Sequence, residues 1–209
     1  MINTADYNKK LLVEGRDDKH VVMALCKNYN ISENFNIVDC EGIDNLLTRD
    51  YISAWFKKSG IKTIGIIIDA DINGQARWNS LFYTLTSIGF RIPNIFPVSG
   101  LIIDNGTQKV GVWLMPDNNS KGMLEDFISF LIPIEDKLLP FVEDALTEIE
   151  KQELNKYSKE HRSKAKIHTW LAWQEDPGTP LGLSITRKYL STDEEICQKF
   201  VKWLSELFK

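Results

Sequence analysis

Acidic residues stand at two points where predicted buried strands end. Glu14 follows a run of Leu and Val, and Asp69 and Asp71 follow the β-branched run of residues 64–68 in the sequence D-A-D. Because ligand sites of open parallel sheets lie beyond the carboxyl ends of the strands, we expect these carboxylates at one edge of a sheet. Residues i and i+2 of an extended chain point the same way, so Asp69 and Asp71 could share one cation. Carboxylate oxygens are the ligands that hard divalent cations prefer, which predicts a Mg²⁺ or Mn²⁺ site.

The same acids have a simpler explanation as helix caps and ion-pair partners. Arg16, Lys19 and Arg77 lie close to them in the sequence, and carboxylates favour the first turn of a helix whatever their function. D-A-D-I-N-G also imitates the start of a calcium-binding EF-hand loop, but Ser80 stands where that loop needs Glu. Phosphatases of the haloacid-dehalogenase type place D-x-D after the first strand, and phospho-receiver domains reverse the order found here. No nucleotide-hydrolase, dehydrogenase, zinc-protease or esterase motif is present.

The elements that must position these acids alternate between strand and helix in the first hundred residues. Strands are predicted over residues 9–14, 35–39, 64–68, 92–98, 101–104 and 109–115, the last two as a hairpin. Helices are predicted over residues 17–29, 42–60, 75–87, 122–132, 135–157, 163–175 and 192–208. This order predicts an α/β fold with a mostly parallel sheet flanked by helices and a helical C-terminal extension. The expected domains are a core of residues 1–131 and an extension of residues 132–209 packed on it.

Composition excludes a disordered, collagen-like or rod-shaped chain. The 209 residues are 43% hydrophobic and 26% charged, and 25 basic against 29 acidic residues give a net charge of −4. A mildly acidic chain argues against a general polyanion binder, yet the charge is unevenly distributed. Residues 117–150 hold nine acids and two lysines, whereas residues 151–168 hold five lysines, one arginine and two glutamates. These runs are either solvated helix faces or an acidic metal-binding end beside a basic strip for a phosphate backbone.

Cysteine content and hydropathy predict neither a disulfide framework nor a membrane span. Cys26, Cys40 and Cys197 form no C-x-x-C pair, so we expect small buried hydrophobes without zinc or disulfide bonds. Residues 1–7 lack the basic start and apolar stretch of a signal peptide. No apolar run approaches the roughly 18 residues of a membrane span. A cytoplasmic location is therefore expected.

A known domain has its acids in the same order and strand context. The segments L-L-V-E-G-R-D-D (residues 11–18) and I-I-I-D-A-D (residues 66–71) resemble the Toprim domain of topoisomerases, primases and related nucleases, over residues 9–100. Residues 111–127 and 168–178 look like a small stand-alone Toprim-like family of unknown function. The resemblance implies a Toprim-like, Rossmann-like fold. It also implies that Glu14 serves in acid–base or metal chemistry and that Asp69 and Asp71 hold Mg²⁺.

A branch of this group, similar to the overcoming-lysogenization-defect nucleases, adds further acids. It has an acid four residues past the Glu, matched here by Asp18, and others from a later segment, for which Glu125 and Asp126 are candidates. This resemblance implies a second metal that would stabilise both attacking and leaving oxygens. Helix-start acids are the alternative for Glu125 and Asp126. We expect no counterpart of the ATPase domain that often accompanies such nucleases in these residues. Lys166 and His168 either contact phosphate or serve structural roles.

The preferred hypothesis is a Mg²⁺- or Mn²⁺-dependent phosphodiesterase, a Toprim-type nuclease acting on DNA or RNA. Its catalytic residues would be Glu14, Asp69, Asp71 and Lys166, and its metal ligands would also include Asp18, Glu125 and Asp126. One alternative is a non-catalytic module that binds nucleic acid or protein and regulates a partner ATPase or a defence complex. Another is nucleotidyl transfer of the primase type.

Overall fold

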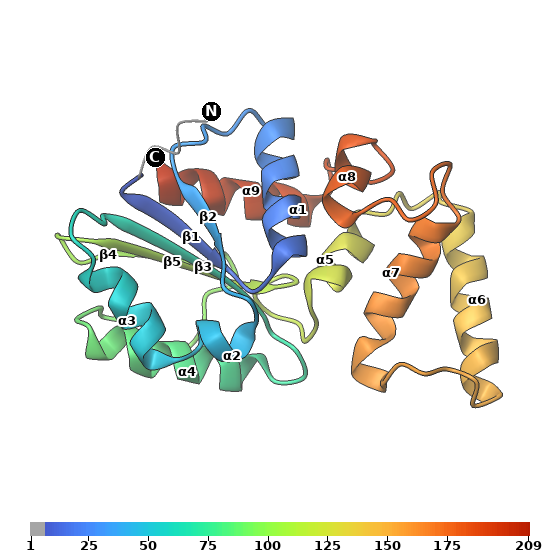
Figure 1. Ribbon diagram of the computed structural model, residues 1–209, viewed down its shortest axis with the longest axis horizontal. Helices are drawn as coiled ribbons and strands as arrows, with labels where there is room; N and C mark the ends of the chain where they lie inside the picture. The colour runs from blue at the N-terminus through green and yellow to red at the C-terminus, as the bar shows by residue number, and fades with distance from the viewer. Residues whose placement is uncertain (1–6) are drawn as a thin grey trace.

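A five-stranded sheet forms the centre of the protein in the computed structural model, which describes residues 7–209. The strands lie in the order β2-β1-β3-β5-β4. Their bounds are β1 (Lys9–Val13), β2 (Asn36–Asp39), β3 (Thr63–Asp69), β4 (Leu101–Asp104) and β5 (Lys109–Met115). Strands β2, β1, β3 and β5 run parallel, and β4 pairs antiparallel with β5 (Figure 1). The predicted α/β fold with a mostly parallel sheet is confirmed, as is the β4–β5 hairpin.

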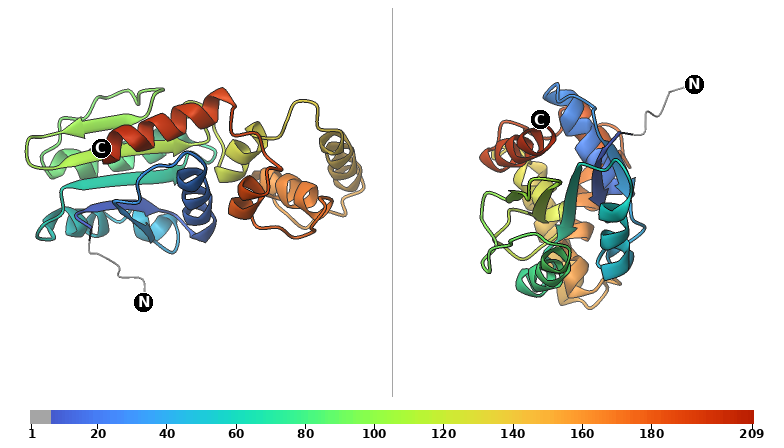
Figure 2. Two further views of the ribbon diagram at one scale, coloured as in Figure 1. Left: turned by 90° about the horizontal axis from the view of Figure 1, so that it is seen from above. Right: turned by 90° about the vertical axis from the view of Figure 1, so that its left-hand side faces the viewer.

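Helices cover both faces of this sheet. They are α1 (Arg16–Asn28), α2 (Ile43–Leu46), α3 (Arg49–Lys57), α4 (Gly74–Ser87), α5 (Leu124–Phe130), α6 (Leu138–Lys151), α7 (Arg162–Ala172), α8 (Leu181–Thr186) and α9 (Glu195–Phe208), with a 3₁₀ turn η1 (Lys159–His161). Successive strand residues point to opposite faces. Leu11 and Val13 therefore pack toward α1 and α9, whereas Leu12 packs toward α2, α3 and α4 (Figure 2). Two apolar layers hold the strand ends, and with them the acids, in fixed positions.

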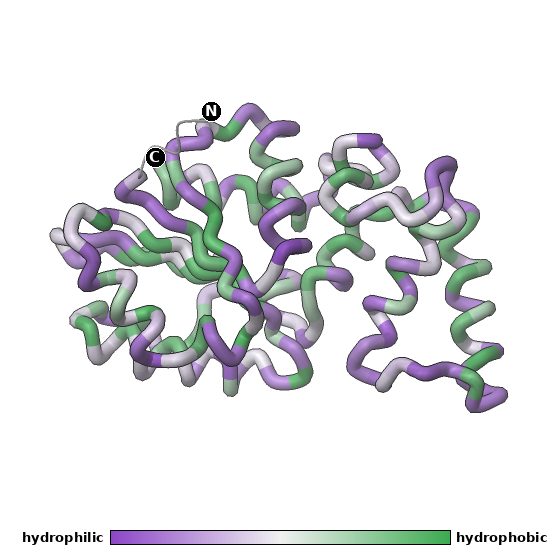
Figure 3. Tube along the Cα trace, viewed as in Figure 1, coloured by the Kyte–Doolittle hydropathy of each residue, from purple (hydrophilic) through white to green (hydrophobic). Residues whose placement is uncertain are grey.

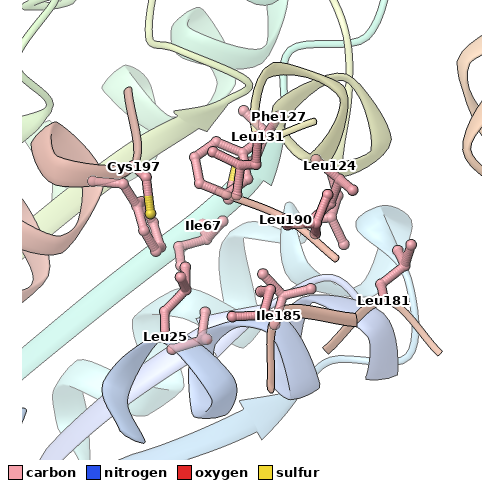
Figure 4. Packing of buried hydrophobic residues seen from close by; sticks show 14 of the residues in the cluster. Leu25, Ile67, Leu124, Phe127, Leu131, Leu181, Ile185, Leu190 and Cys197 are labelled. Atoms are coloured by element: carbon pink, nitrogen blue, oxygen red, sulfur yellow. The ribbon is translucent and has the colours of Figure 1, made fainter. Parts of the chain in front are cut away.

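The layer around α1 and α9 joins the sheet to the rest of the chain. Leu25 of α1, Ile67 of β3, Phe127 of α5 and Cys197 of α9 belong to the same buried cluster (Figure 4). Helix α9 lies directly on the strands because two glycines leave room for its Leu207. A Cβ atom at one of these glycines, Gly111 on β5, would lie 2.6 Å from a Leu207 methyl. The C-terminal helix thus shares the core of the sheet, and the boundary between residues 131 and 132 stays a prediction.

Parts of the predicted secondary structure were wrong. Residues 92–98 form a loop and no strand: two prolines interrupt them, Ile95 is 82% exposed, and β5 takes the place beside β3. The single helix expected over residues 42–60 is divided into α2 and α3, and the helix expected over residues 135–157 is the shorter α6. All three cysteines are free and buried, as expected.

The α6–α7 pair stands apart from the sheet (Figure 1), and both of its helices carry hydrophilic residues (Figure 3). It brings acids of α6 next to bases of α7. Arg162 at the start of α7 lies 2.8 Å from Glu143 and 2.9 Å from Glu150 of α6, and Lys166 lies 3.4 Å from Glu143. Part of the predicted basic strip is therefore neutralised inside this helical hairpin. Within the described residues no helix has the length and apolar character needed to cross a membrane. The leading residues 1–6, expected to carry no targeting signal, lie outside the described part of the chain.

Candidate functional site

Carboxylates from α1, α5, the ends of β2 and β3 and the loops after β1 and β2 line one open pocket of about 510 Å³ at the carboxyl end of the parallel strands. Its charged lining residues are Glu14, Asp17, Asp18, Asp39, Glu41, Asp69 and Glu125, together with Arg16 and Lys164. Four of the six predicted metal ligands therefore meet here, namely Glu14, Asp18, Asp69 and Glu125. Seven acids against two bases make this the strongly anionic region that the sequence predicted for this edge.

Glu14 and Asp69 lie side by side because β1 and β3 are adjacent parallel strands. Glu14 Oε1 accepts a hydrogen bond of 2.6 Å from the Asp69 backbone N–H, and Asp69 Oδ1 accepts one of 2.9 Å from Leu124 N–H. Burial raises the pKa of Glu14 to about 7 despite the bond from Asp69, and the charge of Asp71 adds to the rise. Burial, with the charges of Glu14 and Asp18, also raises the pKa of Asp69 well above its usual range. Both carboxylates are held in position at a high electrostatic cost.

Asp18 reaches the pocket from the first turn of α1. Its Oδ2 accepts a hydrogen bond of 3.1 Å from Gly15 N–H, so it caps the helix, and the residue is only 8% exposed. Burial, followed by the charge of Glu14, raises the pKa of Asp18 to about 7. Capping engages only Oδ2 of Asp18, and the side chain still lies among other acids of the pocket. Asp18 can therefore cap α1 and also be a candidate metal ligand.

Asp71 lies beside the pocket and does not line it. Its φ of +50° takes the chain out of the extended conformation. The prediction that Asp69 and Asp71 point the same way, which needs an extended chain, therefore does not hold. The backbone of Asp71 pairs with Gly122 through two hydrogen bonds of 2.8 Å. Its side-chain Oδ2 accepts bonds from Nε and Nη2 of Arg77. The charge of Asp71 nevertheless contributes to the raised pKa values of Glu14 and Asp69.

The bridge between Asp71 and Gly122 directs the start of α5 into the site. Glu125, in the first turn of α5, is 3% exposed, and its Oε1 lies 3.3 Å from Nζ of Lys164. Asp126 points elsewhere: its carboxylate accepts from Met123 N–H at 2.9 Å and from the Ser163 hydroxyl. Glu125 thus joins the other acids of the pocket. Asp126 instead has the alternative role considered for it, that of an acid that stabilises the start of a helix.

The two lysines of α7 have different surroundings. Lys164 lines the pocket, whereas Lys166, the predicted catalytic lysine, pairs with Glu143 in the α6–α7 hairpin. Residues two positions apart on a helix face nearly opposite directions, so only one of them can face the acids. Sequence reasoning missed Lys164 because the basic run alone does not give the rotation of α7. It also missed Asp39, although an acid at the end of a predicted strand was the signal used for Glu14.

Backbone N–H groups and cations occupy several of these carboxylate oxygens. Among residues 7–209, no group of three or more His, Cys, Asp or Glu side chains is already arranged as a metal site. The donor type still suits a hard cation, because hydrogen bonds hold Glu14 and Asp69 through one oxygen each and leave the other for a ligand. The site therefore offers oxygen ligands of a suitable type without a preformed metal geometry among the described residues.

Comparison with known proteins assigns the chain to a family. The family model described as "Protein of unknown function (DUF3226)" matches residues 8–209. The chain belongs to the DUF3226 family. Among curated proteins no sequence matches this DUF3226 chain.

Two solved structures are similar to this DUF3226 protein, and both are of the C-terminal region of the OLD protein from Xanthomonas campestris pv. campestris. The structure phased with mercury has a TM-score of 0.47 and 12% sequence identity, and the match covers 97% of this chain and 96% of that chain. The structure phased with platinum has a TM-score of 0.45 and 14% sequence identity, and the match covers 97% of this chain and 94% of that chain. The DUF3226 description states no activity, so the functional argument rests on the pocket.

Proposed function

We propose that this protein is a Mg²⁺- or Mn²⁺-dependent phosphodiesterase of the Toprim type that cleaves DNA or RNA. The observation that carries the proposal is the convergence of Glu14, Asp18, Asp69 and Glu125 on one pocket, whose described lining holds seven acids and two bases. Such mutual repulsion lowers the stability of a fold, and perturbed pKa values of this kind are concentrated at functional sites. The order of the acids, which resembles that of Toprim domains, agrees with this assignment.

The residues fit a divalent cation by their chemistry. Glu14 and Asp69 would hold one ion from adjacent strand ends, and Asp71 would complete its ligands from the bridge with Gly122. Asp18 and Glu125 would hold a second ion from the first turns of α1 and α5. When bound, such ions supply charge neutralisation and an activated water for in-line attack on a phosphodiester. The chain itself contributes the fixed backbone hydrogen bonds that keep Glu14 and Asp69 in position.

Lys164 replaces Lys166 as the proposed cationic residue of the reaction. Its ammonium lies over the pocket and is 3.3 Å from Glu125, where charge would develop on a bound phosphate. Its side chain is 51% exposed, so it can leave Glu125 for a substrate at modest cost. Lys166 would instead stabilise the hairpin, since its partner Glu143 also binds Arg162.

Cleavage of labelled single-stranded DNA, duplex DNA and RNA in Mg²⁺ or Mn²⁺ tests the proposal. We expect Asp69→Asn and Glu14→Gln to abolish cleavage and Lys164→Gln to reduce it by about 10²-fold, the usual cost of one electrostatic group. Asp144→Asn, which removes an exposed carboxylate of α6, is the matched control and should retain full activity. Cleavage that survives in Asp69→Asn would remove the assignment.

A second candidate is a non-catalytic binding module that regulates a partner ATPase or a defence complex. It is favoured by the hydrogen bonds that already engage the carboxylates and by the lack of a preformed metal geometry in residues 7–209. This module would bind nucleic acid or protein without turnover, and Asp69→Asn would leave that binding unchanged. The same cleavage assay, run beside a binding assay, separates the two candidates.

A further inference from the structure

Arg77 forms an ion pair with Asp71, one of the two predicted metal ligands that do not line the pocket. Both Nε, at 3.2 Å, and Nη2 donate to the same oxygen of Asp71. The two side chains are 29% and 32% exposed, so water reaches the pair. The guanidinium has five N–H donors in a planar fork, and its remaining donors are those that suit a phosphate oxygen.

The position of Arg77 on its helix is unfavourable without Asp71. It is the fourth residue of α4, whose first turn contains no acid and whose cap, Asn73, accepts a hydrogen bond of 3.0 Å from Ala76 N–H. A cation near a helix N-terminus is repelled by the positive end of the helix dipole. Asp71 neutralises that charge, and a guanidinium that lost Asp71 would need another anion.

A divalent cation would compete directly with Arg77. The bound oxygen of Asp71 can serve the guanidinium or a metal, and two positive charges on neighbouring oxygens repel each other. We propose that Arg77 neutralises Asp71 until a divalent cation takes this carboxylate, and that the released guanidinium then contacts a phosphate of the bound nucleic acid. The proposal rests on the proposed function of the pocket. It adds a substrate-binding residue that works only when metal is present.

Calorimetric titration of Mn²⁺ into the full chain tests the first half. Arg77→Gln removes the competitor and should bind Mn²⁺ about threefold to tenfold more tightly than the native chain, while Arg77→Lys should lie between them. Arg187→Gln is the matched control, because Arg187 forms a similar pair with Asp176 and neither residue lines the pocket. It should leave Mn²⁺ affinity unchanged.

The salt dependence of binding to a single-stranded oligonucleotide tests the second half. One phosphate contact contributes about 0.7 to the slope of log K against log salt for single strands. With Ca²⁺ present, Arg77→Gln should lower the slope by about this amount. In a chelator the slope should be the same for Arg77→Gln and the native chain, because Asp71 then holds Arg77.

Each outcome has a distinct meaning. If neither the native chain nor any variant binds Mn²⁺, the proposed function fails, and the role of Arg77 fails with it. If native chain and Arg77→Gln bind Mn²⁺ equally, or if the variant binds more weakly, the metal site stands and the competition by Arg77 is overturned. If Arg77→Gln lowers the salt-dependence slope equally in Ca²⁺ and in chelator, the release of Arg77 by metal is overturned.

Discussion

Glu143 on α6 and Glu14 at the end of β1 are both partly buried acids, but their surroundings are opposite. Arg162 and Lys166 face Glu143, and although burial opposes it, their hydrogen bonds and charges lower the pKa of this carboxyl. Other carboxylates face Glu14, and burial with the charge of Asp71 raises its pKa to about 7. The hairpin neutralises its acids with bases from the facing helix, whereas the pocket leaves its acids largely unneutralised.

This difference shows which group of acids is structural. In the hairpin, acids and bases that are separate in the sequence lie opposite each other and stabilise α6 against α7. In the pocket, acids from different strands and helices lie close to one another, and their mutual repulsion and burial oppose the gain from their hydrogen bonds. An arrangement that costs stability is expected where a ligand supplies the missing charge.

The largest effect that separates the two regions is the response of stability to pH. A buried acid with a raised pKa keeps a proton that the unfolded chain releases, so stability falls as pH rises toward the folded pKa and stays low above it. The pKa of Asp18 is raised from 3.8 to about 7. Raising the pH from 5.5 to 8 should therefore lower the free energy of unfolding by about 2 kcal/mol through Asp18 alone. Urea unfolding in chelator measures this change.

Asp18→Asn is the control for that experiment, because an amide oxygen can still cap α1 at Gly15. The variant should be more stable than the native chain at pH 8, and the difference should shrink as the pH falls. Identical pH profiles for the two proteins would contradict the raised pKa of Asp18.

A smaller effect is expected where backbone geometry directs Glu125 into the pocket. Gly122 has a φ of +139°, and a Cβ there would lie 2.6 Å from Asp126 Oδ2. Gly122→Ala should therefore destabilise the chain by about 1–2 kcal/mol more than Gly106→Ala, a control with positive φ and no atom near its Cβ. It should also weaken Mn²⁺ binding. Equal stabilities of the two variants, measured by urea unfolding, would show that the Gly122 bridge is not required.

The smallest effect concerns the hairpin. Arg162→Gln breaks contacts with Glu143 and Glu150, and we expect the Tm to fall by about 2–4 °C without any change in Mn²⁺ affinity. Differential scanning calorimetry and titration check the two parts. A loss of Mn²⁺ affinity in this variant would mean that the hairpin and the pocket are not independent.

The sequence predicted the parts of the site that depend on strand order. Glu14 and Asp69 could be placed together because neighbouring parallel strands end at one edge of a sheet, which needs only the order of elements. The sequence pointed to Lys166 and missed Lys164, because the rotation of α7 depends on its packing against α5 and α6, which no local pattern gives. The strand predicted over residues 92–98 failed because its apolar residues lie in a loop broken by prolines. The turn that moves Asp71 toward Arg77 depends on a long-range bridge that no local pattern encodes.

The central claim is that the acids of the pocket hold divalent cations. Anomalous diffraction from crystals soaked in Mn²⁺ tests it most directly. We predict a peak within about 2.5 Å of carboxylate oxygens of Glu14 and Asp69, with Arg77 moved away from Asp71. A second peak near Asp18 and Glu125 would indicate a two-metal site. A map without any peak in the pocket at millimolar Mn²⁺, with Arg77 still bound to Asp71, would contradict the account.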